Sequence, residues 1–373
     1  MIELTREIAW ELACGGPFPT SPQEPDEQYM GLAIRQAMNG VGLSSPNPPV
    51  GCVLEKEGQI LGSGFHSQAG GPHGEIVALM DAEFRGSDIR GATAYVTLEP
   101  CCHQGRTPPC TDALVKAGVS RVVVGVRDPN PRVDGGGLAI LQAHGIQIRE
   151  GVLGEACARL HAPFFKLIRS GLPWVTLKLA LGSDESLGPG DRTVQITSPE
   201  VQSAAHALRR ASEAMVVGRR TALLDDPQLT DRWPLPAPSH RTFLRVVLDS
   251  RGELSGDLRV WKPVQGQPVL RAVVGEPPFL PGVEDLRLPP GPGGCSLRHL
   301  LHELAARGAA RILFEGGGIL AQQLFEQDLL DEFHEFRSAH PAGGPSLDLD
   351  RTKLPHIRSS VQFPSGRWII HQR

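Results

Sequence analysis

The sequence predicts an α/β protein with two domains. A chain of 373 residues is long enough to build two hydrophobic cores. In both halves, short apolar runs typical of strands alternate with segments of helical periodicity, which favours layered domains with largely parallel sheets. Hydrophobic residues make up 40% and charged residues 21% of the chain, as in globular proteins. No internal repeat relates the two halves.

The first half begins with a short helix-like segment and the Pro/Ser-rich stretch GGPFPTSPQEP, so we interpret residues 1–26 as a linker or loose extension. The helical spacing of Met30, Ile34 and Met38 then predicts a helix. Two strands joined at Glu57-Gly58 follow, because this dipeptide favours a hairpin. The remaining expected elements are helices at 75–84, 111–117 and 138–144, and strands at 92–98, 121–126 and 146–152. We expect this domain to end near residue 165 and FFKLIRSGLPW to be a connector.

The second half starts again with the strand pattern WVTLKLAL. A long Pro/Gly-rich loop is expected around residues 276–294. The other expected elements are a helix at 200–211, the strands AMVVG and RVVLDS, a helix from about 297, the strand RILFE, and a helix that follows a triple glycine and runs through 327.

Charge and cysteine content exclude several classes of protein. The formal net charge is -4, the pI is about 6.4 and there is no block of Lys and Arg, so we expect no nucleic-acid partner and no membrane partner. The first residues include acids and lack the pattern of a signal peptide, and no apolar run is long enough to span a bilayer. Seven scattered cysteines then indicate reduced thiols in the cytoplasm, three of them clustered for a metal.

His73, Glu75, Cys101 and Cys110 form the pattern that predicts chemistry. Imidazole and thiolate are usual zinc ligands, and zinc with three protein ligands keeps a fourth position open, as in catalytic sites. The H-x-E and P-C motifs are typical of zinc deaminases, in which the glutamate shuttles protons. The alternatives are a buried histidine beside unrelated cysteines, or a non-enzymatic zinc clip. The order of these residues, each after an expected strand, disfavours the first alternative, and the second leaves Glu75 without a role.

The second thiolate is open to alternatives because the usual P-C-x-x-C is absent: residue 104 is Gln. Cys102 and Cys110 are the candidates, and His103 is a weaker one. Neighbouring cysteines rarely chelate one tetrahedral ion together with good geometry, which favours Cys110.

A family resemblance covers about residues 27–165. The segments SSPNPPVGCV, GSGFHSQAGGPHGE, VTLEPCCHQGRTPPC and DPNPRVDGGG resemble the deaminase half of the bifunctional riboflavin-biosynthesis deaminase-reductase. The resemblance implies a cytidine-deaminase-like three-layer domain with zinc on His73, Cys101 and Cys110, and Glu75 as the catalytic residue. It implies a small-molecule substrate, a diaminopyrimidinone that carries a ribosylamino phosphate. Asn47 and His66 are candidate substrate contacts, although Asn47, flanked by prolines, also suits a simple turn.

The second half resembles the reductase half of the same enzyme over about residues 173–335, in a domain expected to span 173–373. The motifs are PWVTLKLA, VVGRRTALLDDPQLTDR and ILFEGGGILAQQ. The resemblance implies a dihydrofolate-reductase-like domain that uses NADPH; a Rossmann fold is disfavoured because too few residues follow the glycines. The residues that would face NADPH are Ala180, Gln195, Thr221, Asp225, Ser250, Gly317 and Gly318. Those that would face the phosphoribosyl substrate are Thr193, Arg209, Leu229, Arg232 and Glu315.

This second half also departs from the family pattern. Segment 182–190 lacks the usual Gly-Arg pair, Gln195 replaces an aromatic residue that stacks on the cofactor, and Arg220 replaces a glycine. Beyond Phe333 the sequence retains little of the family's closing strand.

We therefore expect a bifunctional enzyme of riboflavin biosynthesis: a zinc-dependent deaminase that acts first and an NADPH-dependent reductase that converts the ribosyl group to ribityl. One alternative is a deaminase with a degenerate reductase half. Another is a nucleic-acid-editing deaminase, which the acidic pI and the absence of a basic, aromatic groove disfavour. Homo-oligomerisation stays open.

Overall fold

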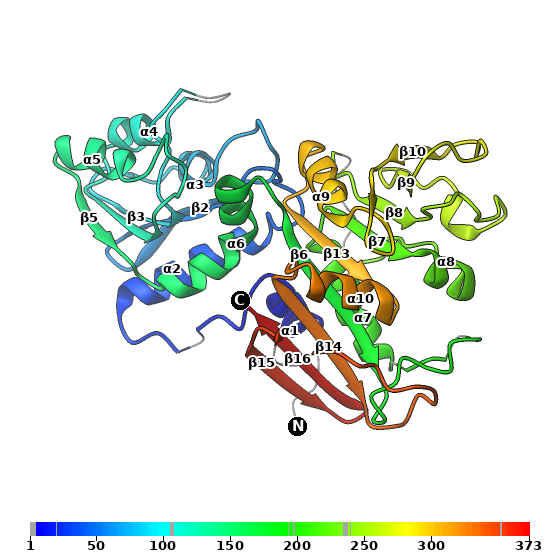
Figure 1. Ribbon diagram of the computed structural model, residues 1–373. Helices are drawn as coiled ribbons and strands as arrows, with labels where there is room; N and C mark the ends of the chain where they lie inside the picture. Colours follow the sequence, from blue (N-terminus) through cyan, green and yellow to red (C-terminus); the bar gives the residue numbers. More distant parts are fainter. Residues whose placement is uncertain are drawn as a thin grey trace. The chain divides into compact units, whose positions relative to one another are not determined.

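The computed structural model describes residues 5–19, 21–104, 108–192, 194–196, 198–233, 238, 240–350 and 353–373. The chain divides into two compact units (Figure 1). The first unit spans Cys14–Gly171, and the second combines Leu172–Arg373 with Met1–Ala13. Both are built from sheets and helices, so the predicted α/β class is confirmed.

A five-stranded sheet with the order β2-β1-β3-β4-β5 forms the centre of the first unit. Strands β1 and β2 are antiparallel, as are β1 and β3, whereas β3, β4 and β5 are parallel. The predicted hairpin is confirmed: Glu57 and Gly58 join β1 to β2 with φ values of 53° and 83°, which fits a tight hairpin turn. The strand bounds are β1 Gly51–Lys56, β2 Gln59–Phe65, β3 Thr93–Leu98, β4 Arg121–Val126 and β5 Gln147–Glu150.

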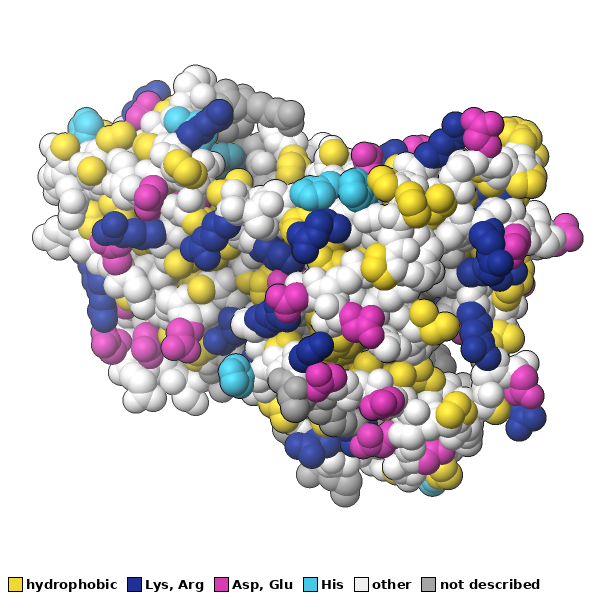
Figure 2. All heavy atoms as spheres, viewed as in Figure 1, with side chains coloured by type: hydrophobic (Ala, Val, Ile, Leu, Met, Phe, Trp, Pro, Cys, Tyr) yellow, Lys and Arg dark blue, Asp and Glu magenta, His cyan; other side chains and the backbone are white. Residues whose placement is uncertain are grey.

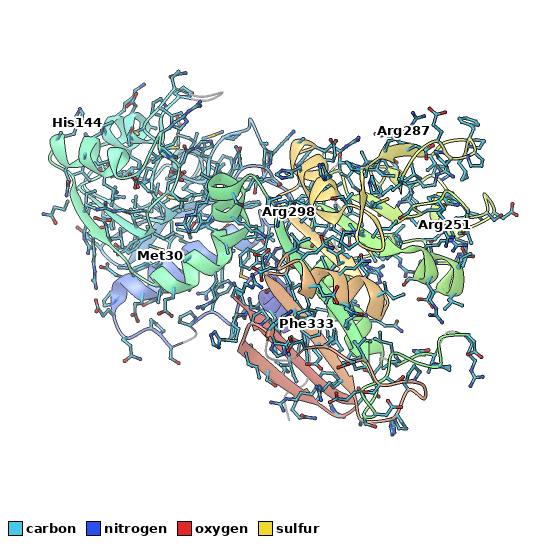
Figure 3. The ribbon with its side chains drawn as sticks, viewed as in Figure 1. Met30, His144, Arg251, Arg287, Arg298 and Phe333 are labelled. Atoms are coloured by element: carbon cyan, nitrogen blue, oxygen red, sulfur yellow. The ribbon has the colours of Figure 1, made fainter. Side chains whose placement is uncertain are left out.

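Helices cover both faces of this sheet and complete the predicted three layers. In β3, Val96 faces a core shared with α3, α4 and α5. Its neighbours in sequence point the other way: Tyr95 donates to Asp26 of α2, and Thr97 contacts His161 of α6. Figure 3 marks Met30 of α2, which is fully buried. The helix bounds are α2 Pro25–Met38, α3 Gly74–Phe84, α4 Cys110–Ala117, α5 Gly136–Ala143 and α6 Gly154–Ser170.

The connector expected at FFKLIRSGLPW is wrong in its first part, because FFKLIRS belongs to α6. Leu160 and Phe164 lie one helical turn apart and are buried, and the helix that they anchor runs on to Ser170. Gly171, with a φ of 69°, ends the helix in the left-handed conformation typical of a C-terminal cap. Pro163 inside the helix concealed this continuity in the sequence.

The second unit contains a nine-stranded sheet with the order β10-β9-β8-β7-β13-β6-β14-β16-β15. The strands from β10 to β14 in this order are parallel, and β16 and β15 complete the sheet in antiparallel fashion. The parallel strand bounds are β6 Trp174–Leu181, β7 Ala214–Gly218, β8 Leu244–Leu248, β9 Val269–Val273, β10 Glu284–Arg287, β13 Arg311–Glu315 and β14 Glu332–Ser338. The antiparallel ones are β15 His356–Phe363 and β16 Gly366–Gln372. Strands β11 Pro290–Gly291 and β12 Gly294–Cys295 form a separate ribbon.

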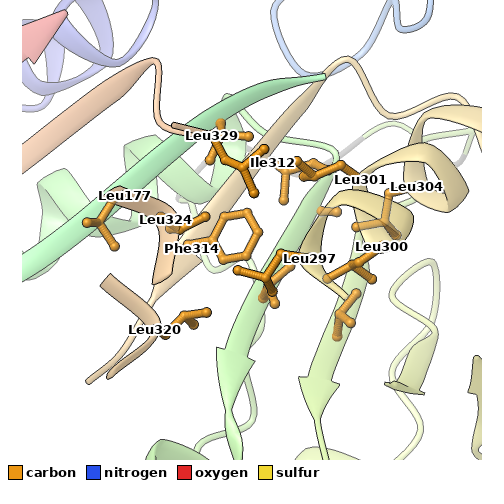
Figure 4. Packing of buried hydrophobic residues seen from close by; sticks show 14 of the residues in the cluster. Leu177, Leu297, Leu300, Leu301, Leu304, Ile312, Phe314, Leu320, Leu324 and Leu329 are labelled. Atoms are coloured by element: carbon orange, nitrogen blue, oxygen red, sulfur yellow. The ribbon is translucent and has the colours of Figure 1, made fainter. Parts of the chain in front are cut away.

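Apolar cores lie on both faces of this sheet. Figure 4 shows the ring of Phe314 from β13 packed among leucines of α9 and α10. A second core contains Val217, Val247 and Trp261. The helix bounds are α1 Arg6–Ala13, α7 Pro199–Arg210, α8 Arg219–Asp225, α9 Leu297–Ala306 and α10 Gly318–Glu326, with a 3₁₀ turn at Arg259–Trp261.

Two further expectations for this unit need correction. The chain beyond Phe333 (marked in Figure 3) does not lose its closing strands, since β14, β15 and β16 all follow residue 331. Buried polar residues concealed them: Glu332 and His334 lie on β14, and Glu332 pairs with Arg358 of β15 at 2.8 Å. The loop expected at 276–294 contains β10 and β11, strands too short for a clear pattern.

Surface charge is mixed on the face drawn in Figure 2. Dark-blue Lys and Arg side chains are interspersed with magenta Asp and Glu side chains there, in agreement with the small net charge of -4. Within the described part of the chain, no helix combines the length and the apolar character needed to cross a membrane.

Candidate active sites

The helix starts of the first unit bring three possible metal ligands together. His73 immediately precedes α3, Cys110 is the first residue of α4, and Cys101 follows β3. The His73 Nδ1 atom lies 3.3 Å from the Cys110 Sγ and 3.5 Å from the Cys101 Sγ. Gly74 allows this approach, because a Cβ there would lie 2.5 Å from the carbonyl oxygen of Val50. A glycine that the sequence marks only as a weak helix former thus has a packing role.

The donor set of this group suits zinc. One imidazole and two sulfurs lie within 4.8 Å of one another, and zinc prefers such nitrogen and sulfur ligands. A hydrogen bond from the Cys110 thiol, together with His73, lowers the pKa of Cys101 to about 4, so one thiolate is available at neutral pH. The same bond raises the pKa of the Cys110 thiol.

The other two candidate ligands are not part of this group. The Cys102 Sγ lies 3.6 Å from the carbonyl oxygen of Arg132, and burial raises the pKa of the Cys102 thiol. The Nδ1 of His103 is buried without a hydrogen-bond partner in the described structure, but His103 does not join the three ligand atoms. Geometry therefore groups Cys110 with His73 and Cys101.

Glu75 lies in the first turn of α3 and is only 2% exposed. Burial, with the charge of Cys101 as a second cause, raises the pKa of the Glu75 carboxyl to about 7. Its Oε2 atom has no hydrogen-bond partner among the described residues, although the Cys110 thiol is within reach of the carboxyl. A buried carboxyl oxygen without a partner beside potential metal ligands is suited to accept and return a proton.

The two predicted substrate contacts of this unit lie beside the ligand group. The Asn47 Nδ2 lies 3.1 Å from the His66 Nε2, and the His66 Nδ1 lies 2.9 Å from the carbonyl oxygen of Pro72. The His66 and His73 rings meet edge to face with centroids 5.0 Å apart. Burial lowers the pKa of His66, so a neutral ring can donate to Pro72 and accept from Asn47.

Glu99 is a residue that sequence reasoning missed. Its carboxylate is 3% exposed and accepts hydrogen bonds from the backbone N–H groups of Asp128, Gly135, Gly137 and Leu138. Glu99, two residues before Cys101, therefore anchors the DPNPRVDGGG segment that leads into α5. The signal was present in the sequence, since the EPC and DPNPRVDGGG motifs both stand out, but nothing linked them.

One edge of the sheet in the second unit carries four of the predicted cofactor residues: Ala180, Ser250, Gly317 and Gly318. Strand β7 ends at Gly218, and β13 ends at Glu315. Ser250 lies two residues after β8, and Ala180 lies near the end of β6. These strands are neighbours, so their carboxyl ends share an edge, which is where open α/β sheets bind ligands. Helices α8 and α10 begin there, directly after β7 and β13.

The contacts made at this edge differ from one predicted cofactor residue to the next. Thr221 lies against the glycine turn, because a Cβ on Gly316 would be 2.8 Å from the Thr221 Oγ1. Ser250 already accepts a hydrogen bond of 2.9 Å from the backbone N–H of Cys295. Gly317 precedes α10, Gly318 is its first residue, and Asp225 is the exposed last residue of α8. The side chain of Gln195 is exposed.

The predicted substrate residues centre on an ion pair. Arg209 of α7 contacts Glu315 of β13 through two hydrogen bonds of 2.9 and 3.1 Å. Lys178 lies opposite Glu315 in the register of β6 and β13. Burial alone would raise the pKa of Glu315, but the charges of Arg209 and Lys178 outweigh this effect and lower the pKa. Lys178 was not predicted, because a lysine within WVTLKLAL is typical of an ordinary exposed position.

The remaining predicted substrate residues differ in exposure. Arg232 is exposed, whereas the Leu229 side chain is 2% exposed and belongs to the apolar core, so only its backbone is available to a ligand. Thr193 lies outside the described residues. Arg220, which replaces a glycine of the family pattern, donates to the carbonyl oxygen of Gly190 at 2.6 Å and so lies against the altered 182–190 segment.

Comparisons with known proteins agree with this architecture. Residues 23–126 match the family described as the cytidine and deoxycytidylate deaminase zinc-binding region, and residues 173–341 match the RibD C-terminal domain. The chain is 38% identical over 353 residues to the riboflavin biosynthesis protein RibD of Escherichia coli, covering 92% of this chain and 95% of that protein. It is 37% identical to RibD of Aquifex aeolicus, covering 91% of this chain and 94% of that protein.

Solved structures lead to the same family. A diaminohydroxyphosphoribosylaminopyrimidine deaminase/5-amino-6-(5-phosphoribosylamino)uracil reductase from Thermotoga maritima is similar with a TM-score of 0.82 and 34% identity, over 93% of this chain and 98% of that one. RibD of Acinetobacter baumannii gives a TM-score of 0.78 and 32% identity over the same shares. The predicted fold class and family are thereby confirmed. With a deaminase domain followed by a RibD C-terminal domain, the chain belongs to the RibD family of bifunctional riboflavin biosynthesis proteins.

Proposed function

We propose that this protein catalyses two consecutive steps of riboflavin biosynthesis: zinc-dependent deamination of a diaminopyrimidinone ribosylamino phosphate, then NADPH-dependent reduction of the ribosyl group of the product. The observation that carries the first step is the grouping of His73, Cys101 and Cys110 beside the Glu75 carboxyl, one oxygen of which has no hydrogen-bond partner among the described residues. The Thermotoga maritima relative is named for the same pair of activities, a deaminase and a reductase.

In the first unit, His73, Cys101 and Cys110 would hold the zinc. A zinc ion with three protein ligands supplies Lewis-acid chemistry and makes a water acidic near neutral pH. Glu75 takes up the proton of the attacking water and passes it to the departing amine, a role that suits a carboxyl with a pKa near 7. Asn47 and His66 orient the pyrimidine ring beside His73.

In the second unit, the carboxyl edge of the parallel strands would hold NADPH, which supplies the hydride. The glycine turn at 316–318 and Thr221 offer backbone and hydroxyl groups at the starts of α10 and α8, where helix N-termini favour phosphate. Arg209 and Arg232 bind the substrate phosphate by charge and hydrogen bonding. Glu315 holds Arg209 in place through two hydrogen bonds.

Metal analysis tests the zinc site. Purified wild-type protein should contain one zinc per chain. Cys110→Ser should lose most of it, whereas the matched variant Cys102→Ser should keep it, because Cys102 points to the carbonyl oxygen of Arg132. Full zinc in the first variant and loss in the second would show that the second thiolate ligand is Cys102.

An activity assay tests the two reactions together. With the diaminopyrimidinone phosphate alone, the protein should release ammonia and accumulate the deaminated ribosyl compound. Addition of NADPH should convert that compound to the ribityl form with matching cofactor oxidation. Absence of ammonia release from zinc-loaded, folded protein would contradict the proposal for the first unit.

A deaminase with an inactive second unit is the rival function. One observation favours it: Gln195 cannot stack on a nicotinamide or adenine ring as an aromatic residue would. Calorimetric titration of the full chain with NADPH distinguishes the two. If no heat of binding is detected at about millimolar NADPH, the binding free energy is weaker than about 4 kcal/mol. That result would support the rival function.

A further inference from the structure

Helix α1 is an integral part of the second unit. Its residues group with Leu172–Arg373 and not with the unit that directly follows it in sequence, and it packs against α7. Ala9, Leu12 and Ala13 are at most 3% exposed. The N-terminal segment therefore carries a docked helix, and the interpretation of residues 1–26 as a loose extension does not hold for α1.

Two arginines hold the C-terminal end of α1. Arg358 of β15 donates to the carbonyl oxygen of Leu12 at 3.1 Å, and Arg311 of β13 donates to that of Ala13. The other side of the Arg358 guanidinium pairs with the buried carboxylate of Glu332 at 2.8 Å. Arginines at a helix C-terminus donate hydrogen bonds to its last carbonyl groups, and their positive charge interacts favourably with the helix dipole. The position of α1 is thus set by specific contacts.

From this fixed helix, Trp10 contacts Trp233. The two ring centroids lie 5.6 Å apart with an interplanar angle of 33°. Trp233 ends the segment 229–233, which also carries Leu229 and Arg232, the residues assigned to the substrate in the proposed reductase reaction. Trp10 is therefore in direct contact with the neighbour of Arg232.

The rest of the segment 229–233 is held from α7 and the adjoining loop. Arg209, the arginine that pairs with Glu315, donates to the carbonyl oxygen of Thr230 at 3.0 Å. The Asp231 carboxylate pairs with Arg241 at 2.8 Å and also accepts the backbone N–H of Trp233 at 2.9 Å. Arg232 thus lies between two residues that have defined partners. Asp231 pairs with Arg241, and the Trp233 ring contacts Trp10.

We propose that Trp10 is a positioning residue for the reductase reaction, acting through Trp233 to hold Arg232 ready for the substrate phosphate. This inference rests on the reductase activity proposed above. Arg232 itself is exposed, so the order of its backbone depends on its two neighbours. Loss of the Trp10 ring releases one of them, and the substrate must then order the segment when it binds. Binding of the substrate weakens, while hydride transfer from bound substrate is unchanged.

Steady-state kinetics on the zinc-loaded full chain test the proposal. For Trp10→Ala we expect the KM for 5-amino-6-(5-phosphoribosylamino)uracil to rise about tenfold with kcat unchanged, since the lost interaction serves binding alone. Trp10→Phe should restore most of the wild-type KM, because a ring remains to contact Trp233. Ammonia release in the first reaction should be unaffected. Phe279→Ala, which truncates an aromatic side chain that is 85% exposed in the same unit, is the matched control and should leave the KM unchanged.

A double variant locates the effect at the contact. Trp233→Ala alone should raise the same KM, and adding Trp10→Ala to it should bring little further change, since both remove one interaction. Additive increases, or a loss of kcat with an unchanged KM, would overturn the positioning role. If Trp10→Ala does not fold, Trp10→Leu keeps apolar volume without the ring, and a wild-type KM in that variant would equally overturn it. Wild-type protein that oxidises no NADPH would instead reject the reductase itself, before any variant is compared.

Discussion

At the residue scale, Glu75 shows how a side chain is restricted to one chemical use. Burial keeps its carboxyl away from bulk water, and the described structure leaves one of its oxygens without a hydrogen-bond partner. A structural carboxylate at such a depth is normally paired, as Glu99 is with four backbone N–H groups. This contrast between the two buried glutamates supports the proposal that Glu75 carries the proton, whereas Glu99 is an anchor.

Glu75→Gln is the variant that tests this role. The amide keeps the size of the side chain but cannot accept a proton at neutral pH, so we expect deamination to fall by at least about a hundredfold, the lower end for a positioned acid–base group. Zinc content should be unchanged, because Glu75 is not one of the three grouped ligands. The assay is ammonia release, with metal analysis and circular dichroism on the same preparation. Near-normal release by a folded, zinc-loaded variant would contradict the assignment.

At the element scale, Asp26 determines how α2 begins. Its carboxylate, in the first turn of the helix, accepts hydrogen bonds from Tyr95 of β3, Arg121 of β4 and Arg149 of β5. One buried side chain therefore connects α2 to three adjacent strands. The bond from Arg121 is the main cause that lowers the pKa of Asp26 to about 2 from an ordinary value of 3.8.

Asp26→Asn should destabilise the first unit in a pH-dependent way. The pKa of Asp26 is lower in the folded state than in the unfolded chain, so its stabilising effect is complete above about pH 4 and disappears as the pH falls towards 2. We expect a loss of about 1–2 kcal/mol in the free energy of unfolding at pH 7, reduced by solvent screening because both arginines are partly exposed.

Urea denaturation at several pH values, followed by a probe in the first unit, measures this difference. The wild-type and Asp26→Asn curves should converge between pH 4 and 2. Glu155→Gln is a suitable control, because the Glu155 side chain is 98% exposed and lies 4.0 Å from Arg159, a distance at which an exposed pair contributes little. A constant difference across the whole pH range would show that shape, and not charge, explains the effect of Asn.

At the scale of the whole molecule, the chain passes between its two units twice, after Ala13 and after Gly171. The second unit is therefore assembled from two separate parts of the sequence, with the first unit encoded between them. A fragment that begins near residue 166 lacks α1, so Arg311 and Arg358 lose their carbonyl acceptors in a buried environment. Studies of an isolated reductase unit need residues 1–13 to be supplied.

Deletion of residues 1–13 from the full chain should weaken the second unit alone. The unit loses the hydrogen bonds from Arg311 and Arg358 and the apolar contacts of Ala9, Leu12 and Ala13, for which we expect about 3 kcal/mol of lost stability. Amide hydrogen exchange reports each unit separately: β13, β14 and β16 should exchange faster, whereas β1, β3 and β4 should not change. A chain that starts at Thr5 keeps α1 and is the control. Equal acceleration in both sheets, or in neither, would contradict the assignment of α1 to the second unit.

Much of the fold follows from local patterns in the sequence. Alternating strands and helices predicted two α/β domains, and Glu57-Gly58 predicted a hairpin that the structure contains. Several elements were not predicted, and three of them illustrate the physical reasons. Pro163 interrupts the helical pattern of α6, buried charges such as Glu332 conceal β14, and β10 has only four residues, too few for a period.

The sequence by itself determined which functional groups are available for chemistry. They are the imidazole of His73, the carboxyl of Glu75 and the thiols of Cys101 and Cys110, each next to an expected helix or strand. These are properties of residue type and short spacing, which local sequence contains. Only the tertiary structure decided that Cys110 and not Cys102 joins His73, since Cys101 and Cys110 are nine positions apart in the sequence and their sulfurs come together only in the fold. It also decided that Trp10 lies against Trp233, more than two hundred residues away in the chain. Contacts of that kind depend on how the sheets and helices pack, and no local pattern specifies them.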